Sequence, residues 1–344
     1  MLARYPEEAT DLGLSSELGL DDARLNDLSP AYMSETSALA QDARDRLAEV
    51  EPETLSADER ITLAVTEWYL DDIVTMSGHA DHEYPVNFIT GSHANFAEFM
   101  ADIHPLESVD DAEAYVARLD AAAGQLAQVA EAVRRAEAAG NLPTDRGLGI
   151  ASWQIGNQVG PAMTHQLVLD FETRLDALDL PLDERDRLTS AAREAVDDRV
   201  VPAYRDLAAT VKSAGSRSDS QPGVLHHPGG SDYYAAALRH HLTSSHTPQA
   251  VHEIGLAGVE RVVAELSGAL GELGFDTEQL GFARAIENAS ASVPAVPLRS
   301  DADRDALLSA TADFVADTQD AFAGMFTTRP AAAIDVRRPR PGRE

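Results

Sequence analysis

Apolar residues recur every three or four positions along most of this sequence, the spacing that places side chains on one face of an α-helix. The clearest example is the stripe from Tyr115 to Val133. Ser108 precedes it and can cap a helix, and Gly140 follows it and can end one. At 1.5 Å per residue, the helix between them would be about 45 Å long, enough to span a domain.

Stripes of the same spacing predict further long helices, and residues that begin helices stand in front of them. Capping patterns occur at Ser29–Pro30, at Ser56 with Glu59, at Thr247–Pro248 and at Ser300 with Asp303. The stripes that follow extend to about residues 50, 73, 273 and 322. Gly274 followed by Phe275 fits the left-handed end of a helix and the apolar contact that accompanies it.

Three segments depart from this pattern. We expect Pro202 to kink a helix over residues 183–211, because proline has no N–H group to donate. The glycine-rich segment 147–160 predicts turns between short helices. Residues 334–336 look extended, but the alternation typical of strands is absent elsewhere. The pattern therefore predicts an all-α fold, an array of long helices.

The same pattern suggests how the chain is organised. We expect a helical region over residues 1–212 and a loop or linker rich in Ser, Gly and Pro over residues 213–231. A second helical region, packed in the same domain, is expected over residues 232–330. Residues 331–344 form a tail rich in Arg and Pro.

Charge changes the picture of the surface. The chain has 58 acidic residues against 27 basic ones, a net charge of −31, and Lys212 is its only lysine. Such a surface repels nucleic acids and anionic membranes, so we expect neither as a partner. It also repels itself, and concentrated salt would screen that repulsion. We therefore predict a halophilic protein. An acidic protein from an ordinary cytoplasm is the alternative.

The composition also restricts the compartment and the chemistry. The chain has no cysteine, which excludes disulfides, thiolate zinc sites and a cysteine nucleophile. Its first 19 residues lack the pattern of a signal peptide, and no apolar run is long enough to cross a membrane. We expect a cytoplasmic protein.

The sequence carries no complete catalytic motif. The zincin motif HExxH needs a second histidine four positions after the first. His82–Glu83 and His252–Glu253 both lack that histidine. A nucleophile elbow and a phosphate-binding loop are also missing. Looser groups occur at His79, His82 and Glu83, at residues 226–227 and at residues 240–246, and we interpret their histidines as solvated or capping side chains. We predict no metal ligand and no catalytic residue.

One local feature suggests a place where a substrate is held. Gly230 allows close approach of the backbone, and the paired Tyr233 and Tyr234 follow it. We predict that these three residues line a substrate cleft. The alternative is the start of a helix, with one tyrosine in the core and the other at its edge.

Four segments together resemble the domain-of-unknown-function 885 family. They are residues 5–13, residues 201–204, the Gly230–Tyr234 segment that leads to Leu238, and Thr247–Pro248 with residues 252–256. In order and spacing, this resemblance extends from Tyr5 to about Pro339.

The resemblance implies more than the residues themselves show. Members of this family resemble helical zincin-type metallopeptidases, with an HExxH helix and a further carboxylate that bind zinc. In them that helix lies C-terminal to everything present here. The resemblance therefore implies the N-terminal scaffold portion of a zinc hydrolase, inactive alone. Zinc is expected only if a separate C-terminal catalytic chain supplies its ligands.

Two other functions stay open. The chain could be a non-enzymatic helical protein that keeps the fold and binds a peptide or a small molecule. It could also be an unaided enzyme that uses His240, His241 and nearby carboxylates. The sequence does not identify the substrate or the oligomeric state.

Overall fold

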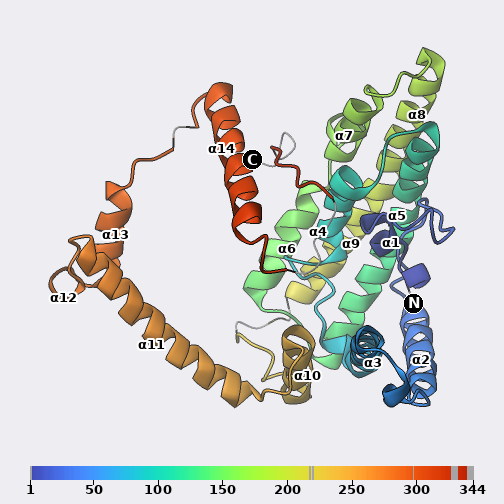
Figure 1. Cartoon of the computed structure of the whole chain (residues 1–344). Coiled ribbons are helices and arrows are strands. Elements are labelled where there is room, and N and C mark those ends of the chain that lie inside the picture. The colour runs from blue at the N-terminus through green and yellow to red at the C-terminus, as the bar shows by residue number, and fades with distance from the viewer. Residues whose placement is uncertain (1, 217, 219–220, 297, 327–331, 339–344) are drawn as a thin grey trace. The chain divides into compact units, whose positions relative to one another are not determined.

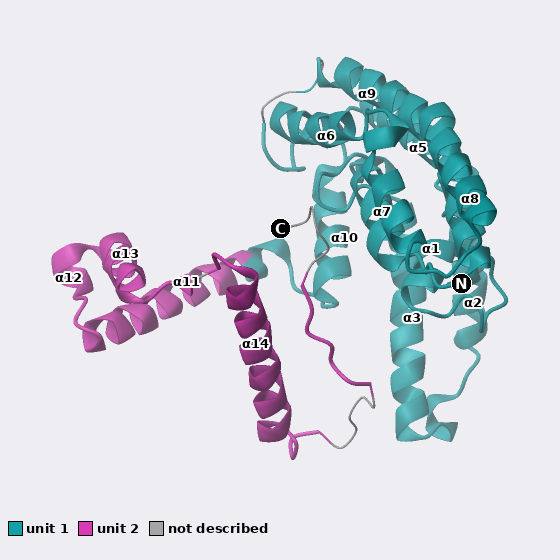
Figure 2. Cartoon of the chain, turned by 90° about the horizontal axis from the view of Figure 1, so that it is seen from above, with its two compact units in different colours: residues 1–251 teal, residues 252–344 magenta. Residues whose placement is uncertain are grey.

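The structure is a computed structural model that describes residues 2–216, 218, 221–296, 298–326 and 332–338. Within these ranges every regular element is a helix, which confirms the predicted all-α fold (Figure 1). The chain divides into two compact units, unit 1 with residues 1–251 and unit 2 with residues 252–344 (Figure 2). No helix in the described ranges is both long and apolar enough to cross a membrane.

Unit 1 contains ten helices with short connections among its described residues. They are α1 (Pro6–Asp11), α2 (Pro30–Leu47), α3 (Ala57–Ser77), α4 (Ser92–Glu98), α5 (Val109–Ala139), α6 (Asp145–Asn157), α7 (Gln166–Leu175), α8 (Leu182–Ala195), α9 (Val201–Gly215) and α10 (Gly230–Leu242). The predicted linker 213–231 overlaps the end of α9 and the start of α10, and the residues between these helices belong to this unit, with 217, 219 and 220 outside the described ranges. The boundary between the units falls in the first turn of α11 (Pro248–Glu272).

The long helix α5 forms the centre of unit 1. Its apolar stripe is buried as predicted, with Tyr115, Leu119, Leu126 and Val133 each at most 1% exposed. The helix packs along α9 and α8, and α6 covers another side of α9. Residues of α4 to α9 join α5 in one continuous hydrophobic core. Burial of this stripe is what holds so long a helix together, because isolated helices are marginal in water.

The predicted helix starts are confirmed by hydrogen bonds. The Ser56 hydroxyl accepts from the Glu59 backbone N–H at 3.3 Å, and the Glu59 carboxylate accepts from the Ser56 N–H at 2.8 Å. The same reciprocal pair forms at the start of α14 (Asp301–Ala321). Ser29 and Ser108 cap α2 and α5. Gly140 ends α5 in the left-handed conformation, with φ of 77°.

The glycine-rich segment 147–160 was expected to form turns, and this prediction is wrong. Helix α6 spans most of it, and Thr144 caps the helix by accepting from the Gly147 N–H at 3.2 Å. Leu148 and Ile155 are buried on the side that packs against α9. Burial of this apolar face outweighs the cost of glycine in a helix, which is about 1 kcal/mol per residue.

The interruption expected at Pro202 begins earlier and has a specific form. A π-helical turn spans Val196–Val200, where the Val201 N–H donates to the Val196 carbonyl. Pro202 then occupies the first turn of α9. Proline inside a continuous α-helix would remove a backbone hydrogen bond and clash with the preceding turn. The wider π-helical turn ends the regular hydrogen bonding of α8 before Pro202.

Unit 2 comprises α11 from His252 onward, α12 (Thr277–Leu280), α13 (Phe282–Ser292) and α14. The Phe275 N–H donates to the Leu270 carbonyl, which confirms the predicted end of α11. Only Leu270 and Ala285 are buried among the described residues of unit 2. The apolar stripe of α11 is therefore largely exposed, including Ile254, Val259 and Leu273. Residues 333–338 form neither helix nor strand.

Candidate functional site

The start of α10 lies against the loop that follows α3. The Tyr233 ring stacks on the His82 ring, with centroids 5.2 Å apart and planes inclined by 18°. His79 contacts both rings, at centroid distances of 5.8 Å to His82 and 5.9 Å to Tyr233. Two histidines of one loop and a tyrosine about 150 residues later in the sequence thus form one aromatic cluster.

The glycines in front of α10 permit this contact. A Cβ atom on Gly230 would lie 1.8 Å from the Val224 carbonyl oxygen, so no larger residue fits there. Gly229 has φ of +70° and lies next to the His82 ring. The His82 Nε2–H group donates to the Pro228 carbonyl at 2.7 Å. The two glycines therefore hold α10 close to His82 and place Tyr233.

His227 fixes the same loop to the end of α5. Its Nδ1–H donates to the Gly140 carbonyl at 3.0 Å. The Nε2 atom then accepts from the Tyr84 hydroxyl at 2.9 Å, which defines the neutral tautomer. One of the predicted solvated histidines is thus a buried connector, 9% exposed.

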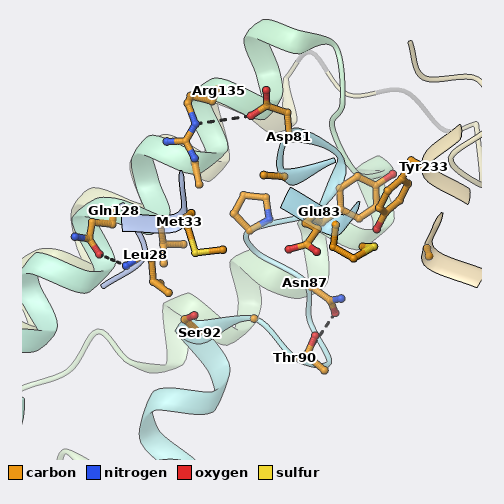
Figure 3. Close-up of a pocket in the computed structure, with 18 of the residues that line it drawn as sticks. Leu28, Met33, Asp81, Glu83, Asn87, Thr90, Ser92, Gln128, Arg135 and Tyr233 are labelled. Carbon is orange, nitrogen blue, oxygen red and sulfur yellow. Dashed lines mark hydrogen bonds and ion pairs between the residues drawn. The ribbon is translucent and has the colours of Figure 1, made fainter. Parts of the chain in front are cut away.

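A cavity of about 430 Å³ lies beside this cluster (Figure 3). Its walls come from α2, α3, α5, α10 and the loop over residues 80–92. Met33, Met76 and Val129 supply apolar surface, while Glu83 and Tyr233 supply polar groups. Clefts of this size with a few converging polar groups are the usual sites of small ligands.

Charged pairs frame the cavity where α10 meets α3. The His240 Nδ1 atom lies 2.7 Å from the Asp72 carboxylate. Asp71 accepts from both Arg44, at 2.7 Å, and Arg239, at 2.6 Å. Asp72 is only 7% exposed, so the partner on α10 compensates a carboxylate that would otherwise lose its hydration.

The protein changes the acidity of two cavity side chains. Desolvation raises the pKa of the Glu83 carboxyl, with a smaller opposing effect of His240 and a raising effect of Asp72. Glu83 still keeps an exposed surface, so protein atoms crowd its carboxyl without enclosing it. Partial burial also raises the pKa of the Tyr233 phenol, and the negative charge of Glu83 adds to this shift. The two groups therefore interact electrostatically.

The three residues predicted for a substrate cleft have different positions. Tyr233 lines the cavity, as the close-up shows (Figure 3). Gly230 is buried and supports Tyr233 without lining the cavity itself. Tyr234 is 40% exposed and is not among the cavity residues.

The sequence suggested Glu83 only in metal-binding patterns, as part of the incomplete zinc motif and of the loose group with His79 and His82. It did not indicate Met33, Met76 and Arg135, which line the same cavity. The one part of the cavity that the sequence indicated is the wall formed by the segment around Gly230, which resembles the family. The opposite wall has no local signal in the sequence, because it comes from separate helices.

The described residues do not fit a zinc site. They contain no group of three or more His, Asp or Glu side chains placed to hold a metal ion. His240 and His241 lie side by side, and His240 contacts one carboxylate, that of Asp72. Tetrahedral zinc sites need three or four such ligands around one ion. No catalytic step through zinc can be built on these residues.

Two other segments that resemble the family, residues 5–13 and 201–204, have structural roles. Arg118 of α5 is fully buried and donates to the Thr10 hydroxyl at 2.7 Å, to the Arg24 carbonyl at 3.0 Å and to His104 Nδ1 at 2.7 Å. It fixes the N-terminal segment on α5. The buried Tyr204 hydroxyl donates to the His93 carbonyl at 2.9 Å and joins α9 to α4.

A solved structure resembles this chain over nearly its whole length. It is described as "the putative lipoprotein from Colwellia psychrerythraea", with a TM-score of 0.81 at 22% sequence identity. The match covers 95% of this chain and 58% of that one, so this chain spans little more than half of its neighbour's length. At that identity the likeness shows the fold alone.

The comparison with protein families gives a broader result. No curated protein matches the chain. The model of the family described as "Bacterial protein of unknown function (DUF885)" matches residues 6–344. Apart from the first five residues, the match includes both units and the segments on which the sequence resemblance depends. The chain therefore belongs to the DUF885 family.

Proposed function

We propose that this chain is the scaffold and substrate-binding portion of a zinc-dependent hydrolase that acts on peptides or other small molecules. In this proposal the cavity of unit 1 receives the substrate. The zinc ligands come from polypeptide that corresponds to the part of the Colwellia protein without a counterpart here. The chain alone is then inactive.

The cavity is the observation that carries this proposal. Tyr233, Glu83 and His240 converge on about 430 Å³ of space, yet the described residues hold no cluster of metal ligands. A site of this kind can bind and orient a substrate, which is the part of catalysis that positioning residues supply.

The exposed apolar side chains of unit 2 support the proposal that a further polypeptide binds this chain. Helix α11 exposes an apolar stripe that includes Ile254, Val259 and Leu273, and α14 exposes Phe314 at 70%. Contiguous apolar surface of this kind marks sites where other protein binds. The match covers 58% of the Colwellia chain, so 42% of that chain has no counterpart here. Polypeptide corresponding to this part is the partner proposed for the apolar surface.

The polypeptide encoded after the codon for Glu344 tests the proposal. We expect it to be helical and to carry HExxH, either in frame or as a separate chain. Co-expressed with residues 1–344, it should bind one-to-one, contribute one zinc ion and give hydrolysis of quenched fluorescent peptides. Residues 1–344 alone should hydrolyse none of them.

Two results would overturn the proposal. One is the absence of any such coding sequence in all three frames. The other is zinc-dependent hydrolysis by residues 1–344 alone. The first would leave a non-enzymatic protein that binds ligands in the cavity, and the cavity itself is the observation that favours this second function.

A further inference from the structure

Glu83 is a carboxylate without a hydrogen-bonding partner in the cavity wall. No hydrogen bond or ion pair to its side chain is found among the described residues, although its carboxyl points into the cavity (Figure 3). Its residue is exposed, so a ligand can reach it from solvent. A carboxylate in such a place attracts a cation, and a charge-assisted hydrogen bond is its strongest available contact.

Basic side chains near Glu83 contact other carboxylates. The Arg135 guanidinium lies 3.8 Å from the Asp81 carboxylate, and Figure 3 shows this pair at the edge of the cavity. His240 directs Nδ1 to Asp72 at 2.7 Å. Arg239 bonds to Asp71. These three side chains therefore direct their contacts to other carboxylates, and none forms an ion pair with Glu83, on which His240 acts only through space.

The surface around Glu83 limits which cation fits. Leu28, Met33, Met76 and Pro85 line the cavity with carbon and sulfur atoms. Methionine side chains adapt to apolar groups of different shapes. The remaining polar lining is mostly neutral, as with Gln128, whose side-chain oxygen already accepts from the Leu28 N–H at 2.8 Å. Asp81 and Glu83 are the two carboxylates of the lining, and the described residues hold no group of three or more side chains placed to bind a bare metal ion, which needs more ligands than this.

We propose that the cavity selects a primary ammonium group on an apolar stem, held by Glu83 with Tyr233 beside it. This inference rests on the proposed function, since it names the substrate class of the same cavity. The chemistry is shared by the free amino terminus of a peptide and by a lysine side chain. Either would place its ammonium group on Glu83 and its carbon atoms against the two methionines.

Calorimetric titration of residues 1–344 tests this selection. The ligands are Leu-Ala-Ala amide with a free amino group, its N-acetylated form, and N-acetyl-lysine amide. We expect the free amine to bind at least about tenfold more tightly than the acetylated peptide, because a hydrogen bond between charged groups is worth that much. Tight binding of N-acetyl-lysine amide would assign the ammonium group to a side chain instead of an amino terminus.

Two variants show whether Glu83 is responsible. Glu83→Gln should reduce the affinity for the free amine to that of the acetylated peptide. Glu131→Gln is the matched control, since Glu131 is exposed on α5, pairs with Arg134 and does not line the cavity. It should bind as the wild type does. Circular dichroism and thermal melting verify that both variants are folded.

The failures of the two proposals can be told apart. Equal affinity of the wild type for the free and the acetylated peptide, or unchanged binding by Glu83→Gln, would overturn the selection of an amine and leave the cavity as a binding site. Absence of binding by all three ligands would overturn the cavity as the substrate site as well.

Discussion

The imidazole of His104 is 1% exposed and lies between Arg118 and the backbone of α5. Its Nδ1 atom accepts from Arg118, and its Nε2–H donates to the Asp111 carbonyl at 3.0 Å. Burial, together with the positive charges of Arg118 and Arg174, lowers the pKa of His104 to about 4. The folded protein therefore holds this histidine neutral near pH 7.

This depressed pKa predicts a loss of stability in acid. The unfolded chain takes up the proton near pH 6.5, whereas the folded chain does so only near pH 4. The free energy of unfolding should therefore fall between these values, by up to about 3 kcal/mol from this residue. His104→Gln keeps both hydrogen bonds and removes the titration. Urea unfolding from pH 7 to pH 4 should show a smaller decrease for this variant.

His246→Gln is the control for that comparison. His246 is exposed and bonds only to Ser244 among the described residues, at 2.9 Å. The free energy of unfolding of His246→Gln should change with pH as that of the wild type does. Identical slopes for the wild type and His104→Gln would show that His104 is not held neutral in the folded state.

Gly230 gives a second prediction at the residue scale. In Gly230→Ala the new Cβ atom would lie 1.8 Å from the Val224 carbonyl oxygen, which forces α10 or the preceding loop to move. We expect the free energy of unfolding to fall by at least about 2 kcal/mol. Denaturant titration measures it, and peptide binding should weaken as Tyr233 is displaced.

Gly149→Ala is the matched control. Gly149 lies in the exposed interior of α6, and nothing lies within 4 Å of its added Cβ atom. This change should stabilise the protein by up to about 1 kcal/mol, because alanine favours helix. Similar destabilisation by both variants would contradict the role given to the Gly230 contact.

At the scale of elements, the helices differ in how far the sequence predicts them. The starts of α2, α3, α5 and α14 depend on capping groups that are adjacent in the chain, and these predictions are confirmed. Helix α6 was missed because its glycines outweighed two local signals, the Thr144 cap and the apolar spacing of Leu148 and Ile155, and because burial against α9 cannot be seen in the sequence. The π-helical turn before Pro202 was also missed, since it depends on how α8 and α9 fit along α5.

The cavity shows the same limit more strongly. Gly230 and Tyr233 stood out because glycine and paired aromatics are unusual at a helix start. Met33, Glu83 and Arg135 come from three other segments, and only the packing of α2, α3 and α5 brings them together. Nothing in the sequence around each of them distinguishes it from an ordinary surface or core residue.

Helix α6 allows a prediction at this scale. Thr144→Ala removes the hydroxyl that accepts from the Gly147 N–H, and it should lower the free energy of unfolding by about 1 kcal/mol. Thr62→Ala is the control, because Thr62 lies in the exposed interior of α3 and only bonds back to the Asp58 carbonyl. That change should be neutral or slightly stabilising. Equal effects in urea unfolding would mean that Thr144 does not begin α6.

At the scale of the whole molecule, charge is the dominant property. The net charge of −31 repels itself, and the screening length decreases from about 10 Å at 0.1 M salt to about 3 Å at 1 M. We expect the melting temperature to rise between these concentrations of KCl. NaCl at equal ionic strength should give a similar rise, since screening does not depend on the cation. A melting temperature that stays constant or falls would contradict adaptation to salt.

In the proposed function, the cavity of unit 1 binds the substrate without zinc. Unit 1 supplies a cavity with Glu83 and Tyr233, while the described residues supply no cluster of metal ligands. The most direct test is titration of Leu-Ala-Ala amide into residues 1–344, once with EDTA and once with ZnCl2. We predict the same affinity in both solutions, and at least about tenfold weaker binding by Tyr233→Ala. Binding that requires zinc, or that is unchanged in Tyr233→Ala, would contradict the account.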